Sequence, residues 1–293
     1  MRILVTGVNG QLGHDVVAEI KKRGYEAIGV DVEQMDITNQ SEVVKFISQI
    51  KPDAVIHCAA WTAVDAAEDC PEKVYAVNAY GTKYIAEVCK ELDCKLMYIS
   101  TDYVFDGQGG KPWEPNCKEY SPLNVYGQSK LDGELAVAEL LEKYFIVRIA
   151  WVFGVNGNNF VKTMLNIGKR YEKLRVVNDQ IGTPTYTYDL ARLLVDMIET
   201  DKYGYYHATN EGGYISWYEF ACEIFRQAEA FGKKEYSSER LQVEAVTTEE
   251  YGLSKAKRPF NSRLDKSKLE ANGFTPLPTW QNALGRYLKE IEF

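Results

Sequence analysis

The feature that most constrains the fold is an alternation, through the first half of the chain, of short apolar runs with segments of helical periodicity. Arg2–Thr6 is an apolar run typical of a buried strand, whereas Gln11–Arg23 repeats its apolar residues at helical spacing. The pattern continues with strands predicted at Glu26–Val30, Ala54–Cys58, Lys95–Ser100 and Phe145–Ala150, and helices at Ser41–Ile50, Pro71–Leu92 and around Tyr126. The Ser41–Ile50 helix has Asn39 as its predicted cap, with Glu42 three residues further on. Because such alternation implies parallel strands joined by helical crossovers, we predict an α/β fold with a Rossmann-like, doubly wound parallel sheet.

The turn after the first strand is rich in glycine and reads Thr6-Gly7-Val8-Asn9-Gly10-Gln11-Leu12-Gly13. Glycine lets the backbone turn sharply and approach a ligand, and the next helix directs free N–H groups at a diphosphate. The spacing departs from the Gly-x-Gly-x-x-Gly fingerprint, and an ordinary tight turn is the alternative. Because a strand precedes it and a helix follows, we interpret it as a dinucleotide-binding loop with contacts from Gly7, Asn9, Gly10, Gln11, Leu12 and Gly13.

An acidic residue closes the second predicted strand. Asp31 can bond ribose hydroxyls and would repel a 2′-phosphate, so the cofactor is NADH or NADPH with a preference toward NADH. Asp36 either faces the adenine or begins the next helix, and we include it with Ile37 among the cofactor candidates. The small residues Ala59 and Ala60, after the third strand, would let the cofactor backbone pass closely, although Cys58 before them also suits ordinary core packing.

Tyr126 and Lys130 lie four residues apart and so share one helical face. A nearby cation favours the phenolate, so we expect Lys130 to lower the pKa of Tyr126 and make it a better general acid. An exposed stacked pair is the alternative, since most such pairs have no catalytic role.

Thr101 follows a strand whose carboxyl end is the usual ligand side of an open sheet, where its hydroxyl can bond a substrate oxygen or simply cap a turn.

Composition excludes several classes of partner. A net charge of −8 without a basic run argues against nucleic acid, and no apolar run reaches the roughly 18 residues that span a bilayer. The opening Met1-Arg2 leads directly into a strand, so we expect no signal peptide.

Six cysteines without Cys-x-x-Cys spacing indicate reduced thiols in a cytoplasmic protein. None of the three histidines has a partner at metal-ligand spacing, and we expect no metal.

After about residue 154 the alternation weakens, which indicates a smaller C-terminal α+β lobe. We assign residues 1–153 and about 172–200 to the dinucleotide-binding domain, so that Leu174–Val177 belongs to it. Residues of about 154–171 and 201–293 are assigned to a substrate-binding lobe, which includes Tyr203–Ala208. The closing helix Thr279–Ile291 carries its apolar residues on one face and is interpreted as core.

Several motifs together carry a resemblance to a known family. The glycine loop, His57-Cys58-Ala59-Ala60, Asn78-Ala79-Tyr80-Gly81-Thr82 and Tyr126-x-x-x-Lys130 resemble the extended short-chain dehydrogenases/reductases. Further motifs narrow the resemblance to the dTDP-4-dehydrorhamnose reductases: Ser100-Thr101-Asp102-Tyr103-Val104-Phe105-Asp106-Gly107, Pro122-Leu123-Asn124-Val125-Tyr126-Gly127, Arg148-Ile149-Ala150-Trp151-Val152-Phe153-Gly154, Asn158-Asn159-Phe160, Asn178-Asp179-Gln180-Ile181-Gly182-Thr183-Pro184-Thr185 and Arg258-Pro259-x-x-Ser262-x-Leu264.

The resemblance implies reduction of the C4 ketone of dTDP-4-dehydro-β-L-rhamnose to dTDP-β-L-rhamnose. Tyr126 would donate the proton, Thr101 would help to hold the carbonyl, and Lys130 would hold the nicotinamide ribose. Further cofactor candidates are Cys58, Ala59, Ala60, Thr62, Asn78, Ser100 and Trp151, although Asn78 equally suits a satisfied polar residue between helices. The substrate candidates are Val64, Asp65, Thr101, Asp102, Tyr103, Tyr126, Trp151, Asn159 and Arg258, with Arg258 as the diphosphate clamp or else a surface arginine.

The resemblance also bears on assembly. Some family members dimerise through Mg²⁺ held by glutamates; the matching positions here keep acids at Asp15 and Glu290 but place Tyr188 where a third carboxylate would lie. We therefore expect a monomer or a weak homodimer. Two other functions remain open: a reductase or epimerase of another nucleotide sugar, and a non-catalytic cofactor-binding regulatory subunit on the same fold.

Overall fold

Six parallel strands form the centre of the fold. The computed structural model describes residues 1–293, and its main sheet has the order β10-β5-β4-β3-β1-β2 with every neighbouring pair parallel. The strands are β1 (Arg2–Thr6), β2 (Glu26–Val30), β3 (Ala54–His57), β4 (Lys95–Thr101), β5 (Tyr144–Ile149) and β10 (Gly204–His207). The α/β fold with a parallel, doubly wound sheet is confirmed.

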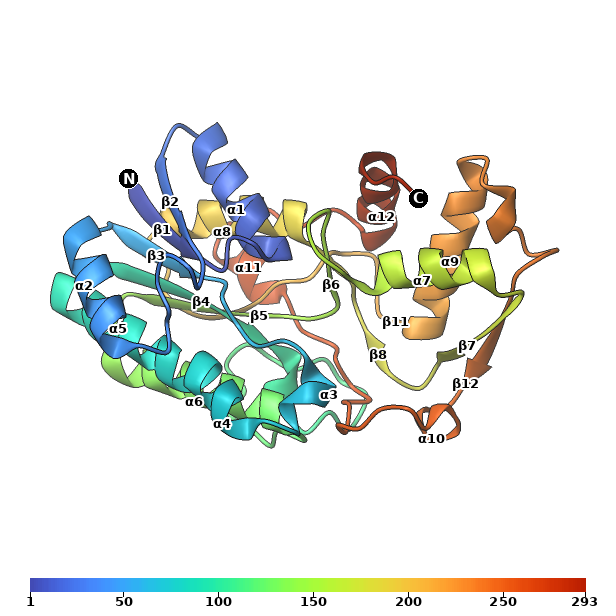
Figure 1. The fold of residues 1–293 in the computed structure, drawn as a ribbon, viewed down its shortest axis with the longest axis horizontal. Helices are drawn as coiled ribbons and strands as arrows, with labels where there is room; N and C mark the ends of the chain where they lie inside the picture. The colour runs from blue at the N-terminus through green and yellow to red at the C-terminus, as the bar shows by residue number, and fades with distance from the viewer.

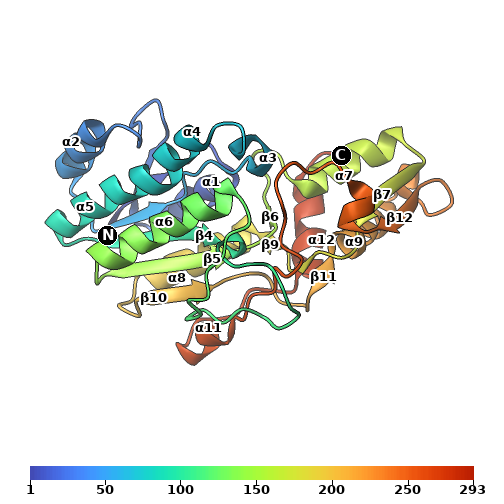
Figure 2. The ribbon, with the colours of Figure 1, turned by 90° about the horizontal axis from the view of Figure 1, so that it is seen from below.

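Helices cover both faces of this sheet (Figure 1), and Figure 2 shows the same layers from below. One face packs against α1 (Gln11–Lys22) and α8 (Thr187–Ile198). The other packs against α2 (Gln40–Ile50), α5 (Thr82–Leu92) and α6 (Val125–Leu140). Successive strand residues enter opposite cores, so the strands are mostly apolar on both faces.

The helix expected over residues 71–92 is not one regular helix. It divides into α4 (Pro71–Tyr75), a π-helical segment η1 (Ala76–Gly81) and α5, which follow one another without a break. Capping behaves as the sequence predicts at α2, where the Asn39 side chain accepts hydrogen bonds from the Ser41 and Glu42 N–H groups.

A second lobe lies beside the sheet domain, on the right in Figure 1. Its core is formed by α7 (Phe160–Arg170), α9 (Trp217–Ala230) and α12 (Trp280–Glu290). The lobe also contains the strand pairs β7 (Lys173–Val177) with β12 (Gln242–Val246), β8 (Ile181–Gly182) with β11 (Ile215–Ser216), and β6 (Val152–Phe153) with β9 (Thr185–Tyr186). Short helical turns complete the chain: α3 (Val64–Ala67), η2 (Asp102–Val104), η3 (Lys234–Tyr236), α10 (Thr248–Tyr251) and α11 (Ser267–Ala271). None of the helices combines the length and the apolar character that crossing a bilayer requires.

Two segments were assigned to the wrong part of the molecule, one to the dinucleotide-binding domain and one to the substrate-binding lobe. Leu174–Val177 belongs to β7, which pairs with β12 and contributes to the core of the second lobe. Tyr203–Ala208 contains β10, which forms the edge of the main sheet beside β5. Both placements were wrong because strand pairing joins segments distant in sequence, and apolar periodicity does not specify the partner.

A buried ion pair fixes α6 to the sheet. Arg148 of β5 donates two hydrogen bonds to Glu134 of α6, Nε to Oε1 at 2.8 Å and Nη2 to Oε2 at 2.6 Å, and both side chains are fully buried. The guanidinium also lies 4.9 Å from the centre of the Phe105 ring and 4.8 Å from that of Tyr205.

We predict that Glu134→Gln lowers the free energy of unfolding by about 3–5 kcal/mol, because the buried guanidinium of Arg148 would lose its counter-charge. Urea unfolding followed by circular dichroism measures this. Glu26→Gln, in the exposed Arg2–Glu26 pair, is the matched control and should change little. A loss for Glu134→Gln no larger than that of the control would contradict the assignment.

Candidate active site

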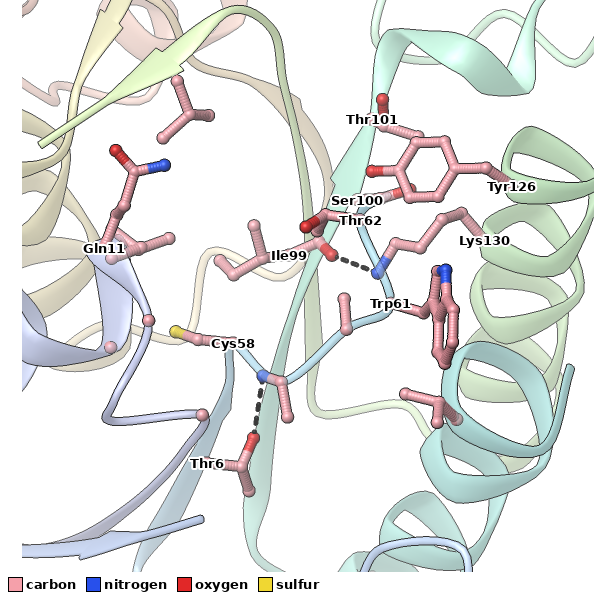
Figure 3. Close-up of a pocket in the computed structure, with 18 of the residues that line it drawn as sticks. Thr6, Gln11, Cys58, Trp61, Thr62, Ile99, Ser100, Thr101, Tyr126 and Lys130 are labelled. Carbon is pink, nitrogen blue, oxygen red and sulfur yellow. Dashed lines mark hydrogen bonds between the residues drawn. The ribbon is translucent and has the colours of Figure 1, made fainter. Parts of the chain in front are cut away.

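A cavity of about 970 Å³ opens at the carboxyl ends of β1, β2, β3, β4 and β5. In Figure 3, Gln11 lies on one side of it and Tyr126 and Lys130 on the other. Its volume is that of a site for a cofactor-sized ligand. The candidates that line it are Gly7, Asn9, Gly10, Gln11, Leu12, Gly13, Asp31, Asp36, Ile37, Cys58, Ala59, Ala60, Thr62, Val64, Ser100, Thr101, Asp102, Tyr103, Tyr126, Lys130 and Trp151.

The glycine loop forms one wall, and neither Gly7 nor Gly13 has room for a side chain. Gly7 has φ +70°, and a Cβ placed on it would lie 2.7 Å from the backbone of Ala59. A Cβ on Gly13 would lie 2.3 Å from the carbonyl oxygen of Gly7. Helix α1 begins after Gly10 without any side-chain cap, so its first N–H groups are not satisfied by a capping side chain. This arrangement fits the diphosphate of a dinucleotide.

The second lobe braces the glycine loop. Asn156 Nδ2 donates to the carbonyl oxygen of Asn9 at 2.8 Å, and Asn159 Nδ2 donates to Gln11 Oε1 at 3.0 Å. Asn159 also caps α7 through Lys162 N–H and bonds Gly154 O and the Tyr287 hydroxyl. It does not line the cavity, so its position does not support the substrate contact expected from the sequence.

Asp31 stands at the end of β2 with its carboxylate held by two backbone groups. Oδ2 accepts from Asn9 N–H at 3.0 Å and Oδ1 from Val32 N–H at 2.9 Å. Asp36 is also oriented locally, because its Oδ1 accepts from the N–H and the hydroxyl of Thr38. Lys73 and Lys130 are the only basic side chains that line the cavity.

The Tyr126–Lys130 face of α6 points into the cavity as the spacing predicts, but the lysine does not acidify the phenol. Lys130 is buried, and its Nζ donates to the carbonyl oxygen of Ile99 at 2.7 Å and lies 4.0 Å from the centre of the Tyr98 ring. Burial lowers the pKa of Lys130 to about 7. Burial also raises the pKa of Tyr126 well above its usual value, and a hydrogen bond with Thr101 offsets this only in part. The expected acidification was wrong because burial dominates the pKa of Tyr126, and the groups that act on it are Thr101, Asp102 and Tyr103, not Lys130.

Thr101 and Asp102 join the end of β4 to η2 at the cavity wall. The Thr101 hydroxyl donates to Asp102 Oδ1 at 3.0 Å and accepts from Tyr103 N–H at 3.3 Å. Ser100 Oγ and Asp102 Oδ2 are buried without a hydrogen-bond partner. Buried polar atoms left unpaired beside a cavity are suited to bonding a ligand.

Asn78 lies behind the cavity wall and not in it. Its side chain accepts from Trp61 N–H at 2.8 Å and donates to Trp61 O and Ser129 Oγ. It is fully satisfied and does not line the cavity, so the structural alternative accounts for it and its position does not support a direct cofactor contact. His57 is similarly internal, bonded to Thr6 and Thr82, and burial lowers its pKa to about 3.

Arg258 and Asp65 pair with each other at the edge of the site. Arg258 Nη2 donates to Asp65 Oδ2 at 2.7 Å, and Nη1 donates to the Tyr103 hydroxyl at 3.1 Å. Neither charged residue lines the cavity, although Val64 and Tyr103 beside them do. The position of Arg258 therefore does not support a direct diphosphate contact, and its role as a clamp stays a prediction.

Trp151 meets a tryptophan that the sequence analysis missed. Trp217, the first residue of α9, stacks on Trp151 with ring centres 3.7 Å apart, and both line the cavity. Trp151 has φ +52°, a costly backbone conformation for a non-glycine residue. Gly182 makes room for the indole, since a Cβ there would lie 2.8 Å from it.

Other lining residues were also missed: Thr6, Val30, Val32, Met35, Thr38, Trp61, Lys73, Ala76, Val77, Ile99, Ile149, Ala150, Val152 and Trp217. Those at strand ends could have been found from the rule that ligands bind beyond the carboxyl ends of parallel strands. Trp217 had no such signal, because only tertiary folding brings α9 to the sheet domain. No group of three or more His, Cys, Asp or Glu side chains is arranged to hold a metal ion.

Fold and site together define a dinucleotide-binding α/β protein with a Tyr–Lys pair facing its glycine loop. The family model described as "RmlD substrate binding domain" matches residues 1–293. A dTDP-4-dehydrorhamnose reductase of Aggregatibacter actinomycetemcomitans is 43% identical over 292 residues, covering 97% of each chain. The spore coat polysaccharide biosynthesis protein SpsK of Bacillus subtilis is 38% identical, covering 99% of this chain and 97% of that one. The chain therefore belongs to the dTDP-4-dehydrorhamnose reductase family, and the resemblance found in the sequence is confirmed.

Solved structures support the same family assignment. A dTDP-4-dehydrorhamnose reductase of Clostridium acetobutylicum superposes with a TM-score of 0.92 at 43% identity, covering 99% of each chain. The Bacillus anthracis enzyme in complex with NADP gives 0.92 at 42% identity, also over 99% of each chain. A UDP-glucose 4-epimerase of Thermus thermophilus, at 19% identity and a TM-score of 0.80, shares the fold alone.

We predict that NADH binding weakens several-fold between pH 6 and pH 8. The pKa of Lys130 is about 7, so its ammonium loses the proton over this range and would become a poorer donor to the cofactor ribose, the contact that the family resemblance implies. Titration of reduced-nicotinamide fluorescence measures the affinity. Lys130→Met should bind more weakly with a flatter pH dependence, whereas Lys73→Met, at the other lysine of the cavity, should keep the wild-type profile. An unchanged profile in Lys130→Met would exclude this role.

Proposed function

We propose that the chain uses NADH or NADPH to reduce the C4 ketone of dTDP-4-dehydro-β-L-rhamnose to dTDP-β-L-rhamnose, the last step of dTDP-rhamnose biosynthesis. The observation that carries the proposal is one cavity lined by Thr101, Tyr126 and Lys130 on one side and by the glycine loop on the other. Relatives named dTDP-4-dehydrorhamnose reductase at 36–43% identity over nearly the whole chain support the choice of substrate.

The proposed chemistry follows from where negative charge develops. A bound reduced nicotinamide supplies the hydride. As the ketone oxygen becomes an alkoxide, the Tyr126 hydroxyl donates its proton and the Thr101 hydroxyl donates a hydrogen bond to the same oxygen. The raised pKa of Tyr126 keeps the phenol protonated at neutral pH, as a donor must be. Gly7, Gly10 and Gly13 admit the diphosphate, and Lys130 holds the ribose.

Turnover of a small panel of substrates tests the assignment. Purified protein is mixed with NADH or NADPH and a set of nucleotide-linked 4-keto-sugars, and absorbance of the reduced cofactor is followed. We expect oxidation of cofactor with dTDP-4-dehydrorhamnose above all other members. Preferential use of another sugar would favour the alternative of a different nucleotide-sugar enzyme, and cofactor binding without any turnover would favour a regulatory subunit.

We predict that Tyr126→Phe lowers kcat by about 10²–10⁴-fold while NADH binding is kept, because a positioned proton donor is removed without changing the shape of the site. Steady-state kinetics and cofactor fluorescence measure the two quantities. Tyr103→Phe is the matched control, since this ring packs against Tyr126 with centres 5.4 Å apart and also lines the cavity. The mechanism would be abandoned if Tyr126→Phe turned over no more slowly than Tyr103→Phe.

We also propose a preference for NADH over NADPH. The Asp31 carboxylate lines the cavity, is fixed by Asn9 and Val32 N–H groups, and has no arginine beside it among the lining residues. A 2′-phosphate placed there would meet a like charge. The Bacillus anthracis structure holds NADP, so the assay with this chain decides the preference.

Asp31→Ser should lower the KM for NADPH about tenfold, which corresponds to about 1.4 kcal/mol, and raise that for NADH. KM values for both cofactors give the ratio directly. Glu33→Ser, an exposed acid two residues further on that does not line the cavity, should leave the ratio unchanged. Equal effects of the two substitutions would show that general charge, not the position of Asp31, sets the preference.

A cytoplasmic location and a monomeric or weakly dimeric state complete the proposal. All six cysteines are free thiols, in keeping with a reducing compartment. Asp15 and Glu290 already accept hydrogen bonds from Thr187 and Tyr186 respectively. Sedimentation at several concentrations measures the assembly state.

A further inference from the structure

Asp102 is a buried carboxyl group without a counter-charge. It is 2% exposed, lines the cavity at the start of η2, and its Oδ2 has no hydrogen-bond partner. Asp102 forms no ion pair, and two cations of this region are engaged elsewhere, Arg258 with Asp65 and Tyr103, and Lys130 with the carbonyl of Ile99. An ionised carboxylate in such surroundings is unfavourable.

The neighbouring hydroxyl has only one proton to give. Thr101 Oγ1 accepts from Tyr103 N–H and lies 3.0 Å from Asp102 Oδ1. When Asp102 is ionised it can only accept, so the proton of Thr101 must point at it. When Asp102 is neutral, its O–H can donate to Thr101 through the same contact. The Thr101 proton is then free to point at Tyr126 and the reacting oxygen.

We propose that Asp102 works as a neutral carboxylic acid, which donates to the Thr101 hydroxyl and so directs the Thr101 proton to the oxygen of the ketone. Asp102 is then a positioning residue that acts through Thr101, and this role rests on the reductase function proposed above. No proton leaves Asp102 during the reaction. The Asp102 carboxyl group is needed in its protonated form because its proton sets the direction of the Thr101 hydroxyl.

Burial among uncharged groups favours the neutral form of Asp102. The phenols of Tyr103 in η2 and Tyr126 in α6 face it and are uncharged, and the Ser262 hydroxyl approaches from the loop before α11. Burial raises the pKa of Asp102 to about 6 and outweighs the lowering by Ser262 and Thr101. A bound cofactor and a nucleotide sugar bring negative phosphates and exclude water, and both raise it further. Thr101 is therefore free to donate below the pKa of Asp102 in the complex and is held by the carboxylate above it.

An ionised Asp102 would have a different role, because its Oδ2 could accept a hydroxyl of the sugar. The two roles differ in their dependence on pH and on Thr101. A carboxylate that binds the sugar directly needs no proton and acts independently of Thr101. A neutral acid loses its effect as the pH rises, and has none when the threonine hydroxyl is absent.

Asp102→Asn provides the test, since its Nδ2 can donate to Thr101 at every pH. We measure kcat for NADH and dTDP-4-dehydrorhamnose from pH 5 to pH 9 in wild type, Asp102→Asn, Thr101→Val and the double variant. The ratio of kcat in Asp102→Asn to kcat in wild type should rise by up to about tenfold per pH unit above the pKa of Asp102. In the Thr101→Val background the ratio should be flat. Titration of Lys130 is common to numerator and denominator and cancels.

Infrared difference spectra of wild type against Asp102→Asn, recorded with NADH bound, give an independent readout that needs no turnover. A carbonyl band of a neutral carboxylic acid at pH 5, lost in the variant, is expected. A carboxylate band at that pH, a flat ratio, or a rising ratio that persists in Thr101→Val would each overturn the proposal. If no keto-sugar is turned over, the reductase function fails. The infrared spectrum then still decides whether Asp102 is neutral. Circular dichroism of each variant confirms that it is folded.

Discussion

The position of the Tyr–Lys pair depends above all on one buried ion pair. Tyr126, Lys130 and Glu134 follow one another at intervals of four residues on α6. Glu134 is paired with Arg148 of β5, and the Lys130 ammonium adds a hydrogen bond to the Ile99 carbonyl oxygen of β4. A helix packed by apolar contacts alone can slide or rotate at modest cost. A bidentate ion pair surrounded by the rings of Phe105, Tyr120 and Tyr205 has one favourable geometry. The same contact therefore fixes how far Tyr126 and Lys130 project beyond the end of β4.

Much of the sheet domain could be predicted because its information is local. β1 and β2 have the bounds that apolar runs indicate, and Asn39 caps α2 as expected, since both signals lie within a few residues of the structure they specify. The glycine loop belongs to the same class: a strand, a turn and a helix adjacent in sequence suffice to place Gly7, Gly10 and Gly13 beside a cavity.

What the sequence left out depends on contacts between distant segments. Trp217 reaches Trp151 only because α9 folds back beside the sheet domain, and β10 joins the main sheet after the chain has built half of the second lobe. Asn78 and Asn159 were candidate site residues because they are polar residues in motifs of the family. Both side chains form their hydrogen bonds with other groups of the protein. A motif identifies candidate site residues. Tertiary structure decides whether such a residue contacts a ligand itself or positions another residue that does.

Burial gives the site a low charge of its own, and this explains why proximity was a poor guide to its acid–base chemistry. Desolvation raises the pKa values of Tyr126 and Asp102 and lowers those of Lys130 and His57, so each group moves toward its neutral form. With little fixed charge beside Tyr126 and Thr101, the negative charge that forms on a ketone oxygen would be stabilised by the direction of a few hydroxyl protons. The orientation of Thr101 and Tyr126 then matters more than their intrinsic acidity, and the groups that set it belong to the machinery as much as those that contact the substrate.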